Sequence, residues 1–187
     1  MAGPFLFIFT GTGGSGRKTI GNRIGEELGM YPIPSYTTRP PRTSDAAGKP
    51  DRDYHFVTRE AFEELERNGE FVETVTIHRE RYGVRRSDVE NALLHAKRNA
   101  YVIVNPEGAD ALKKQYGPSV IRLFLYTDKA TVRARLEAKG TSFEIADRYM
   151  KDYAEEVLYR KQCEHVIENL ELLPTLARIR EAIQAHL

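Results

Sequence analysis

The feature that most constrains the fold is an apolar run that leads directly into a glycine-rich segment near the start of the sequence. Residues 5–9 are all apolar and show no alternation with polar residues. Such a run is typical of a strand that is buried on both faces of a parallel sheet. Glycines follow from Gly11 to Gly16, and an amphipathic helix is predicted over about residues 19–28. A strand, a glycine turn and a helix in this order predict a sheet that is covered by helices.

The remaining pattern predicts an α/β fold with an inserted segment whose hydrophobic pattern differs from that of the core. Three later apolar runs are predicted as core strands and alternate with amphipathic helices, at residues 102–104, 120–125 and 165–167. This alternation favours a mainly parallel sheet. Residues 31–84 differ, because they contain short strand-like runs at 35–38, 55–57 and 71–77 and a helix over about 59–68. We expect a small antiparallel insert there.

Composition and charge exclude several classes of function. A chain of 187 residues is predicted to form one domain. Lys and Arg number 28 against 27 Asp and Glu, a balance too even for binding nucleic acid by bulk charge. No apolar run approaches the ~18 residues of a membrane span, and the single Cys163 excludes a disulfide framework. We expect a cytoplasmic protein whose partners include neither nucleic acid nor a membrane.

The glycine-rich segment has the composition of a phosphate-binding loop but not its usual ending. Backbone amides around Gly11, Gly13, Gly14 and Gly16, together with the start of a helix, are suited to an anion. The common phosphate-binding loop, or P-loop, ends in Lys and then Ser or Thr. The lysine contacts the transferred phosphates, and the hydroxyl holds Mg²⁺.

Neither register of that pattern is complete in this sequence. When Gly11 and Gly16 take the glycine positions, Arg17 and Lys18 stand where the lysine and the hydroxyl belong. Shifting the pattern by one residue restores a lysine and a hydroxyl, Lys18 and Thr19, but loses both glycines. We therefore expect a phosphate loop in which Arg17 and Lys18 take the catalytic positions and ATP binds weakly. No separate metal site is predicted, and Mg²⁺ is expected only with a bound nucleotide, weakly or not at all.

A second cluster of cations lies in residues 35–42, which read SYTTRPPR. Arg39 and Arg42 are three positions apart, in a loop that prolines stiffen. Two guanidinium groups at this spacing are suited to a charge-assisted grip on one phosphate. The string therefore predicts a second phosphate site.

Four motifs in order resemble those of the guanylate kinase family, over essentially the whole chain. Residues 37–42 match that family's Thr-Thr-Arg-x-Pro-Arg motif. Residues 53–56 resemble its Asp-Tyr-x-Phe segment, residues 70–73 its Glu-Phe-x-Glu strand, and residues 82–83 its Tyr-Gly pair. The resemblance implies a P-loop nucleoside monophosphate kinase-like parallel sheet flanked by helices, with a small mixed α/β GMP-binding insert and a helical lid.

The same resemblance implies a single domain in three parts. Residues 1–34 and 86–187 would form the core, residues 35–85 the GMP-binding subdomain, and residues from about 135 to 155 the lid. The inserted segment is therefore expected to be the part of the chain that binds GMP.

The resemblance also implies roles in the GMP site. The residues expected to hold the phosphate are Arg39, Arg42, Tyr54 and Tyr82. Glu73 would accept hydrogen bonds from guanine N1–H and the exocyclic amine, and Ser35 would bond to O6. Adenine lacks both donors, which would leave the carboxylate unpaired at a cost of about 1–3 kcal/mol. The family has Ser or Thr where this chain has Val84, so one base contact is expected to be lost.

The half of the site that would hold ATP departs further from the family. The family's Asp-x-Asp pair corresponds to Ile103 and Asn105, and neither carries a charge that could balance a divalent ion. Of the lid cations, Arg135 and Arg148 resemble those that close over the transferred phosphoryl group.

Three functions remain open on these patterns. The first is phosphoryl transfer from ATP to GMP, weakened by the altered ATP half. The second is binding of GMP or GDP without catalysis. The third is binding of a phosphorylated peptide at the GMP-phosphate site, as in the guanylate-kinase-like domains of scaffold proteins. We expect a protein that binds GMP, and catalysis is left open.

Overall fold

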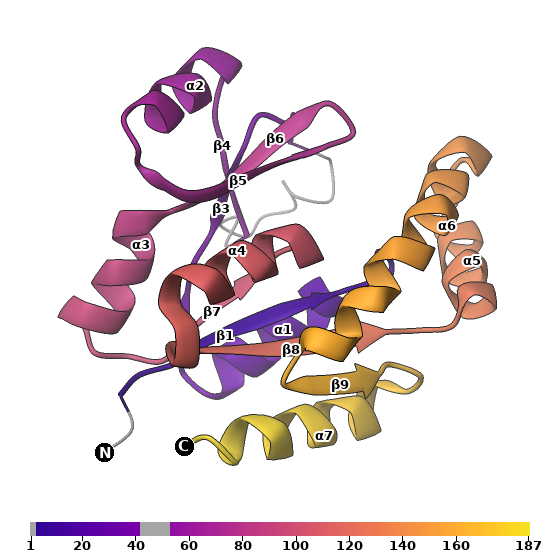
Figure 1. The fold of residues 1–187 in the computed structure, drawn as a ribbon. Coiled ribbons are helices and arrows are strands. Elements are labelled where there is room, and N and C mark those ends of the chain that lie inside the picture. The colour runs from indigo at the N-terminus through magenta and orange to yellow at the C-terminus, as the bar shows by residue number, and fades with distance from the viewer. Residues whose placement is uncertain (1–2, 42–52) are drawn as a thin grey trace.

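The central feature of the computed structural model, which describes residues 3–41 and 53–187, is a five-stranded parallel sheet (Figure 1). The strand order is β2-β7-β1-β8-β9, and each neighbouring pair is parallel. The strands are β1 Leu6–Gly11, β2 Tyr31–Pro32, β7 Ala100–Ile103, β8 Val120–Tyr126 and β9 His165–Glu168. The predicted parallel sheet is confirmed. Its edge strand β2 has only two residues, too few to give a hydrophobic pattern.

The helices connect these strands and cover the sheet. Among the described residues the α-helices are α1 Arg17–Glu27, α2 Arg59–Arg67, α3 Arg86–Glu90, α4 Pro106–Tyr116, α5 Lys129–Ala138, α6 Phe143–Leu158 and α7 Leu172–Gln184. A π-helical segment, Asn91–His95, continues α3, and 3₁₀ turns follow α4 and α6. None of the helices within the described residues is long and apolar enough to span a membrane.

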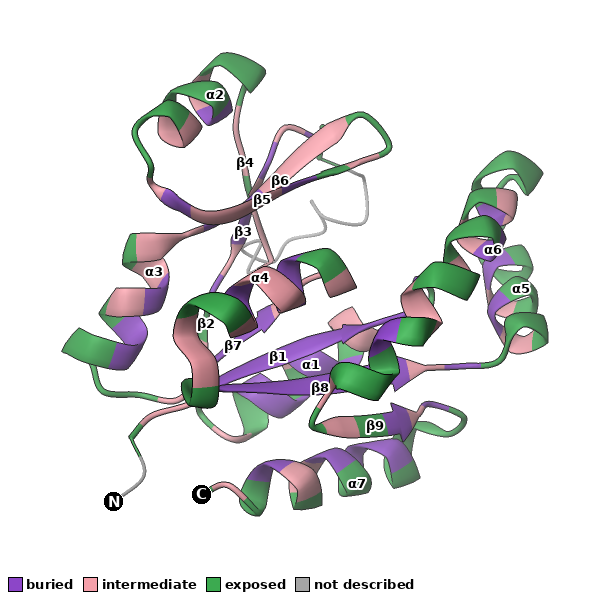
Figure 2. Ribbon diagram, viewed as in Figure 1, coloured by how far each residue is buried: buried purple, intermediate pink, exposed green. Residues whose placement is uncertain are grey.

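Strand β1 begins with apolar side chains only, because both of its faces are buried and successive side chains pack in two different hydrophobic cores. All six of its residues are buried. Leu6 and Ile8 pack with residues of α3 and α4, whereas Phe7 and Phe9 pack with residues of α1 and α7. Figure 2 shows the buried strand among helices whose outer faces are exposed. This burial fixes where β1 ends, and therefore where the glycine-rich loop begins.

A second, smaller sheet is formed by residues of the expected insert. Its order is β4-β3-β6-β5, with β3 Ser35–Thr37, β4 Tyr54–Phe56, β5 Phe71–Ile77 and β6 Glu80–Arg85. The pairs β3–β6 and β5–β6 are antiparallel, but β3–β4 is parallel. The expectation of an antiparallel insert therefore holds for β3–β6 and β5–β6 but is wrong for β3–β4, where the two strands run in the same direction. Figure 1 shows this sheet and α2 to one side of the core.

Helices α5 and α6 pack against each other beyond the end of the main sheet (Figure 1). Val132 and Leu136 of α5 and Ala146 and Met150 of α6 form a hydrophobic cluster of their own. Each helix begins with a side-chain cap: Asp128 accepts from the amide of Thr131, and Ser142 accepts from that of Ile145.

The packing of α1 on β7 gives a stability prediction. A Cβ at Gly25 would lie 2.2 Å from Cε1 of Tyr101, whereas a Cβ at Gly21 would come no closer than 3.0 Å, to Phe9. We expect Gly25→Ala to lower the free energy of unfolding by about 1–3 kcal/mol, because the buried ring must move. Gly21→Ala should cost less, since the helix propensity of alanine offsets the milder crowding. Urea denaturation followed by circular dichroism measures both, and equal stabilities would contradict the packing described.

Candidate functional site

The glycine-rich loop lies where β1 ends and α1 begins. A Cβ at Gly11 would lie 1.8 Å from the carbonyl oxygen of Leu125 on the neighbouring strand, so this position can only be glycine. Gly16 precedes α1 with a φ of 83°, a left-handed conformation that favours glycine. Both glycines therefore serve the loop geometry, and the loop's amides lie at the N-terminus of α1, where an anion is favoured.

An internal carboxylate already occupies part of this loop. The amide of Gly13 donates to Oε1 of Glu156 on α6, at 3.2 Å. The ring of Tyr149, also on α6, is so close that a Cβ at Gly13 would lie 2.5 Å from its Cδ1. Burial raises the pKa of the Glu156 carboxyl, while the charge of Arg17 and the Gly13 amide oppose that rise. Helix α6 therefore supplies an anion at the place where a phosphate loop would bind one.

The two cations that follow the loop take different directions. Nη1 of Arg17 donates to the carbonyl of Gly11 at 3.0 Å, so this guanidinium folds back onto the loop. Nζ of Lys18 instead lies 3.3 Å from Oδ2 of Asp53, just before β4 of the smaller sheet. Thr19, the alternative hydroxyl, is exposed on α1. The structure thus places only Arg17 of the predicted pair against the loop.

A chain of polar contacts ties α1 to both sheets. The hydroxyl of Tyr101 on β7 donates to Oδ1 of Asn22 at 2.9 Å. Nδ2 of Asn22 donates in turn to Oδ1 of Asp53 at 2.8 Å, and Oδ2 of the same carboxylate pairs with Lys18. Asp53 is therefore the point at which the smaller sheet is fastened to the helix that follows the glycine loop.

The aromatic and cationic residues predicted to hold a monophosphate are brought together. Arg39 is buried, with its Cζ 4.9 Å from the ring centroid of Tyr54 and 5.3 Å from that of Phe56. The rings of Tyr54 and Tyr82 are 6.1 Å apart. Burial raises the pKa of the Tyr82 hydroxyl, which keeps it a proton donor. Arg42, the fourth predicted residue, lies outside the described residues.

Glu73 is the carboxylate predicted to read a base. It lies on β5 directly across from Val84 on β6, and its Oε1 faces Gly108 at the start of α4. Its Oε2 is buried and has no hydrogen-bond partner among the described residues. Burial and the nearby Glu107 raise the pKa of Glu73 to about 7. A buried acceptor without a donor is costly, which suggests that a donor arrives with a ligand.

Ser35 and the two positions of the missing acidic pair occupy different environments. Ser35 is buried on β3, and its amide donates to the carbonyl of Asp53 at 2.8 Å. Ile103 packs on α1, with its Cγ1 3.2 Å from where a Cβ at Gly21 would lie. Asn105 caps α4, because its Oδ1 accepts from the amide of Gly108 at 2.9 Å. Neither Ile103 nor Asn105 therefore presents a negative charge near the loop.

The lid cations differ in how they are held. Nη2 of Arg135 donates to the carbonyls of Asn169 and Leu170, at 3.1 and 3.3 Å. Nδ2 of Asn169 donates to the carbonyl of Ser15 at 2.7 Å, so Arg135 is linked to the glycine loop through Asn169. Arg148 is exposed on α6. Within residues 3–41 and 53–187, no three His, Cys, Asp or Glu side chains are grouped to hold a metal ion.

Sequence reasoning missed Glu156, Tyr149 and Asn169. All three reach the glycine loop from α6 or from the end of β9, more than 130 positions further along the chain. No local motif signals these contacts, since each depends on how distant elements pack. The Asp53-Tyr54 motif did point to this region, but not to the contact with Lys18.

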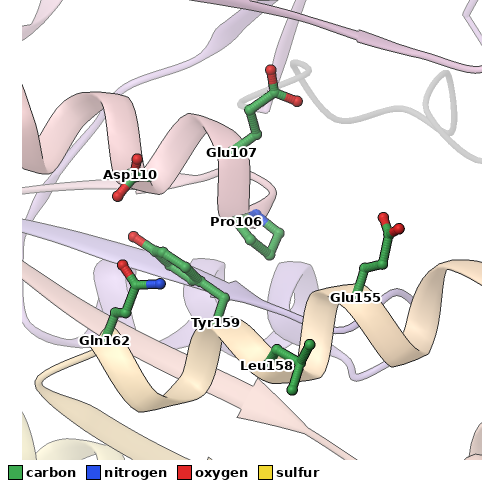
Figure 3. A pocket seen from close by; sticks show the side chains of 7 residues that line it. All are labelled: Pro106, Glu107, Asp110, Glu155, Leu158, Tyr159 and Gln162. Atoms are coloured by element: carbon green, nitrogen blue, oxygen red, sulfur yellow. The ribbon is translucent and has the colours of Figure 1, made fainter.

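A separate groove between α4 and the end of α6 has a different chemistry (Figure 3). Its volume is about 350 Å³, and its charged side chains are the carboxylates of Glu107, Asp110 and Glu155. These groups repel a phosphate, so the groove is not a second anion site.

Comparison with known proteins supports one family throughout. The family model described as guanylate kinase matches residues 5–186. The chain is 29% identical over 170 residues to a guanylate kinase of Fusobacterium nucleatum, covering 89% of each chain. It is 30% identical over 183 residues to one of Porphyromonas gingivalis, covering 95% of each. The crystal structure of guanylate kinase from Anaplasma phagocytophilum superposes with a TM-score of 0.76 at 25% identity, covering 98% of this chain and 85% of that one. This chain belongs to the guanylate kinase family.

Proposed function

We propose that this protein binds GMP and transfers a phosphoryl group to it from ATP, slowly, because the half of the site that would hold ATP is altered. The observation that carries the proposal is the GMP half. There a buried arginine and two tyrosines lie on or beside the smaller sheet, together with Glu73, whose buried Oε2 has no donor among the described residues. These groups supply donors for a phosphate and acceptors for a guanine edge.

The phosphate of GMP would lie between Arg39, Tyr54 and Tyr82. A guanidinium donates charge-assisted hydrogen bonds, which are about twice as strong as neutral ones. The rings of Tyr54 and Phe56 cover Arg39 and limit its motion. Because the guanidinium is already held in place, little side-chain entropy is lost when the phosphate binds. Arg42 is proposed as a fourth contact from its place in the motif.

The base would be recognised by Glu73 and Ser35. Guanine presents N1–H and an exocyclic amine on one edge, and both would donate to the Glu73 carboxylate. The buried Oε2 of Glu73, which has no donor among residues 3–41 and 53–187, would thereby gain one. Adenine presents an acceptor at N1, which would face the carboxylate with no proton between them. Ser35, buried on β3, would donate to guanine O6.

The ATP half retains the loop but lacks ligands for a metal. Guanylate kinases use Mg²⁺ with ATP; in this chain Lys18, Ile103 and Asn105 stand where a hydroxyl and two carboxylates would hold it. These residues do not fit Mg²⁺, so the ion would be held by nucleotide phosphates and water. Arg17 would leave the Gly11 carbonyl to contact the phosphates, joined by Arg135. Arg148 is proposed as a further lid contact.

The transfer itself would depend on positioning. A phosphate oxygen of GMP forms a bond to the γ-phosphorus of ATP while the bond to the bridging oxygen of ADP breaks. Holding both nucleotides in line supplies most of the catalysis in such reactions. Arg39 and Arg17, on the two sides, would limit charge repulsion between the phosphates.

A second candidate function is binding of GMP, GDP or a phosphorylated peptide without transfer. The contact between Glu156 and Gly13 favours it, because this contact fills part of the loop that ATP would use. Both functions use Arg39, Tyr54 and Tyr82 to bind a phosphate, and they differ in whether ATP binds. Titration with ATP–Mg²⁺ therefore separates them.

The proposed GMP site predicts a clear preference between purines. Calorimetric titration should show GMP binding roughly tenfold or more tightly than AMP, because AMP leaves Glu73 unpaired. Glu73→Gln, of nearly the same shape, should remove most of that preference by turning one acceptor into a donor. Equal affinities for the two nucleotides in the native protein would show that Glu73 does not read the base.

The raised pKa of Glu73 predicts a pH dependence. Guanine needs the ionised carboxylate as an acceptor, so below a pH of about 7 a proton must leave Glu73 when GMP binds. GMP affinity should therefore fall as the pH drops below 7. Val84→Thr places a hydroxyl donor across from Glu73 and should lower this pKa, which moves the fall in affinity to lower pH. It should also strengthen GMP binding by about 0.5–1.5 kcal/mol.

Two comparisons make this test specific. The phosphate of GMP itself titrates near pH ~6, so the native protein and Val84→Thr are compared with the same ligand. Val89→Thr makes the same change at a buried position of α3, which is not paired with Glu73 across the sheet, and serves as the control. An unchanged pH profile in Val84→Thr would contradict the assignment.

The carboxylate on the glycine loop predicts a gain of affinity on its removal. Glu156→Gln keeps the shape of the side chain but removes the charge that an incoming phosphate would meet. We expect ATP–Mg²⁺ and inorganic tripolyphosphate to bind severalfold more tightly, with GMP affinity unchanged. Glu155→Gln, the exposed neighbour on α6, is the control. Weaker triphosphate binding in Glu156→Gln would mean that this carboxylate supports the loop rather than competing with a phosphate.

A further inference from the structure

Lys18 lies between the two halves of the site. In the P-loop pattern its position holds a hydroxyl that faces a metal ion on the ATP side. Here its ammonium lies 3.3 Å from Asp53 and 4.7 Å from the ring centroid of Tyr54. Both partners belong to the segment proposed to bind GMP. The Lys18 side chain is thus directed from α1 towards the residues proposed to bind the GMP phosphate, Arg39, Tyr54 and Tyr82.

We propose that Lys18 binds the phosphate of GMP. Its position in the P-loop pattern would instead place it on the ATP side. The assignment rests on the proposed function. It is carried by the Tyr54 ring, which has two cations close to it. Nζ of Lys18 is 4.7 Å and Cζ of Arg39 is 4.9 Å from the same centroid. A phosphate held beside this ring is within reach of both.

The chemistry of the lysine side chain fits this role. An ammonium has three donors on a flexible four-carbon stem, so Lys18 can keep one hydrogen bond to Asp53 and give another to a phosphate oxygen. The Lys18 side chain is 43% exposed. The side chain of Asp53 is only 15% exposed, so Lys18 would keep this partner and contact a phosphate with its remaining donors.

The proposal also accounts for a cation at a position that would otherwise face a metal. A positive charge that reaches the GMP phosphate offsets part of the repulsion that the γ-phosphate of ATP would meet on approach. Arg17, held against the Gly11 carbonyl, remains for the ATP side. Lys18 would therefore contact the phosphate of GMP, and its neighbour Arg17 would contact the phosphates of ATP.

A purely structural role for Lys18 makes a different prediction. The contacts of Asp53 with Lys18 and Asn22 fasten the smaller sheet to α1. If Lys18 served only that link, its removal would loosen the whole GMP site and weaken any ligand bound there, with or without a phosphate.

Calorimetry with GMP and with guanosine separates the two roles. We expect Lys18→Met to weaken GMP binding by about 10- to 100-fold, the worth of a hydrogen bond to a charged group, and to leave guanosine within twofold. Lys18→Ser, which restores the motif's hydroxyl, should lose as much GMP affinity as Lys18→Met. Arg23→Met removes an exposed cation from the same helix and should change neither ligand. Circular dichroism confirms that each variant is folded.

Asp53→Asn provides the second arm. It removes the ion pair but leaves Lys18 in place, so any loss of affinity should be no larger for GMP than for guanosine. GMP binding by Lys18→Met equal to that of the native protein would overturn the proposal, and so would equal losses for GMP and guanosine. A native protein that binds neither ligand would overturn the proposed function and this inference with it. If the native protein binds GMP and Lys18→Met binds it equally well, the role of Lys18 is overturned and the proposed function stands.

Discussion

The burial of β1 on both faces is the constraint on which the rest of the structure depends. Its side chains alternate between two hydrophobic cores, so turning the strand over would put Phe7 and Phe9 where Leu6 and Ile8 now pack and would disrupt both cores. The strand therefore delivers Gly11 to a fixed place beside Leu125 of β8. From there the loop and the start of α1 follow, and α1 carries Arg17, Lys18 and Asn22 to their partners.

The groups proposed to meet the two nucleotides differ at Glu73, Gly13 and Arg17. In the GMP half, the buried Oε2 of Glu73 lacks a donor among the described residues. In the ATP half, the Gly13 amide and the Arg17 guanidinium already have internal partners, in Glu156 and the Gly11 carbonyl. A ligand at Glu73 supplies a missing hydrogen bond, whereas one at Gly13 and Arg17 must displace existing ones. The buried hydroxyls of Thr12 and Ser15 in the loop, like Glu73, have no partner among the described residues. This asymmetry underlies the proposal of a protein that binds GMP well and uses ATP slowly.

Sequence patterns predicted what is local and could not predict what depends on distant packing. The run that forms β1, the glycine loop and the strand Phe71–Ile77 were all predicted, because each carries its own hydrophobic period. Strand β6 was missed, since its polar and glycine residues become a strand only by pairing with β5. The direction of Lys18 was also beyond sequence reasoning, because it depends on a carboxylate 35 positions away. The contact of Glu156 with the loop spans 143 positions and has no local signal.

The most direct test of the account is the initial rate of GDP formation from ATP–Mg²⁺ and GMP, measured as the GMP concentration is raised. The account predicts a rate that saturates with GMP, because Arg39, Tyr54 and Tyr82 are brought together as proposed for a GMP site. It also predicts a maximum well below the ~1–100 s⁻¹ of ordinary kinases, because Glu156 contacts the glycine loop and the described residues group no three His, Cys, Asp or Glu side chains for a metal. A maximum within that range would contradict the view that the ATP half is impaired. A rate that does not saturate with GMP would contradict the GMP site.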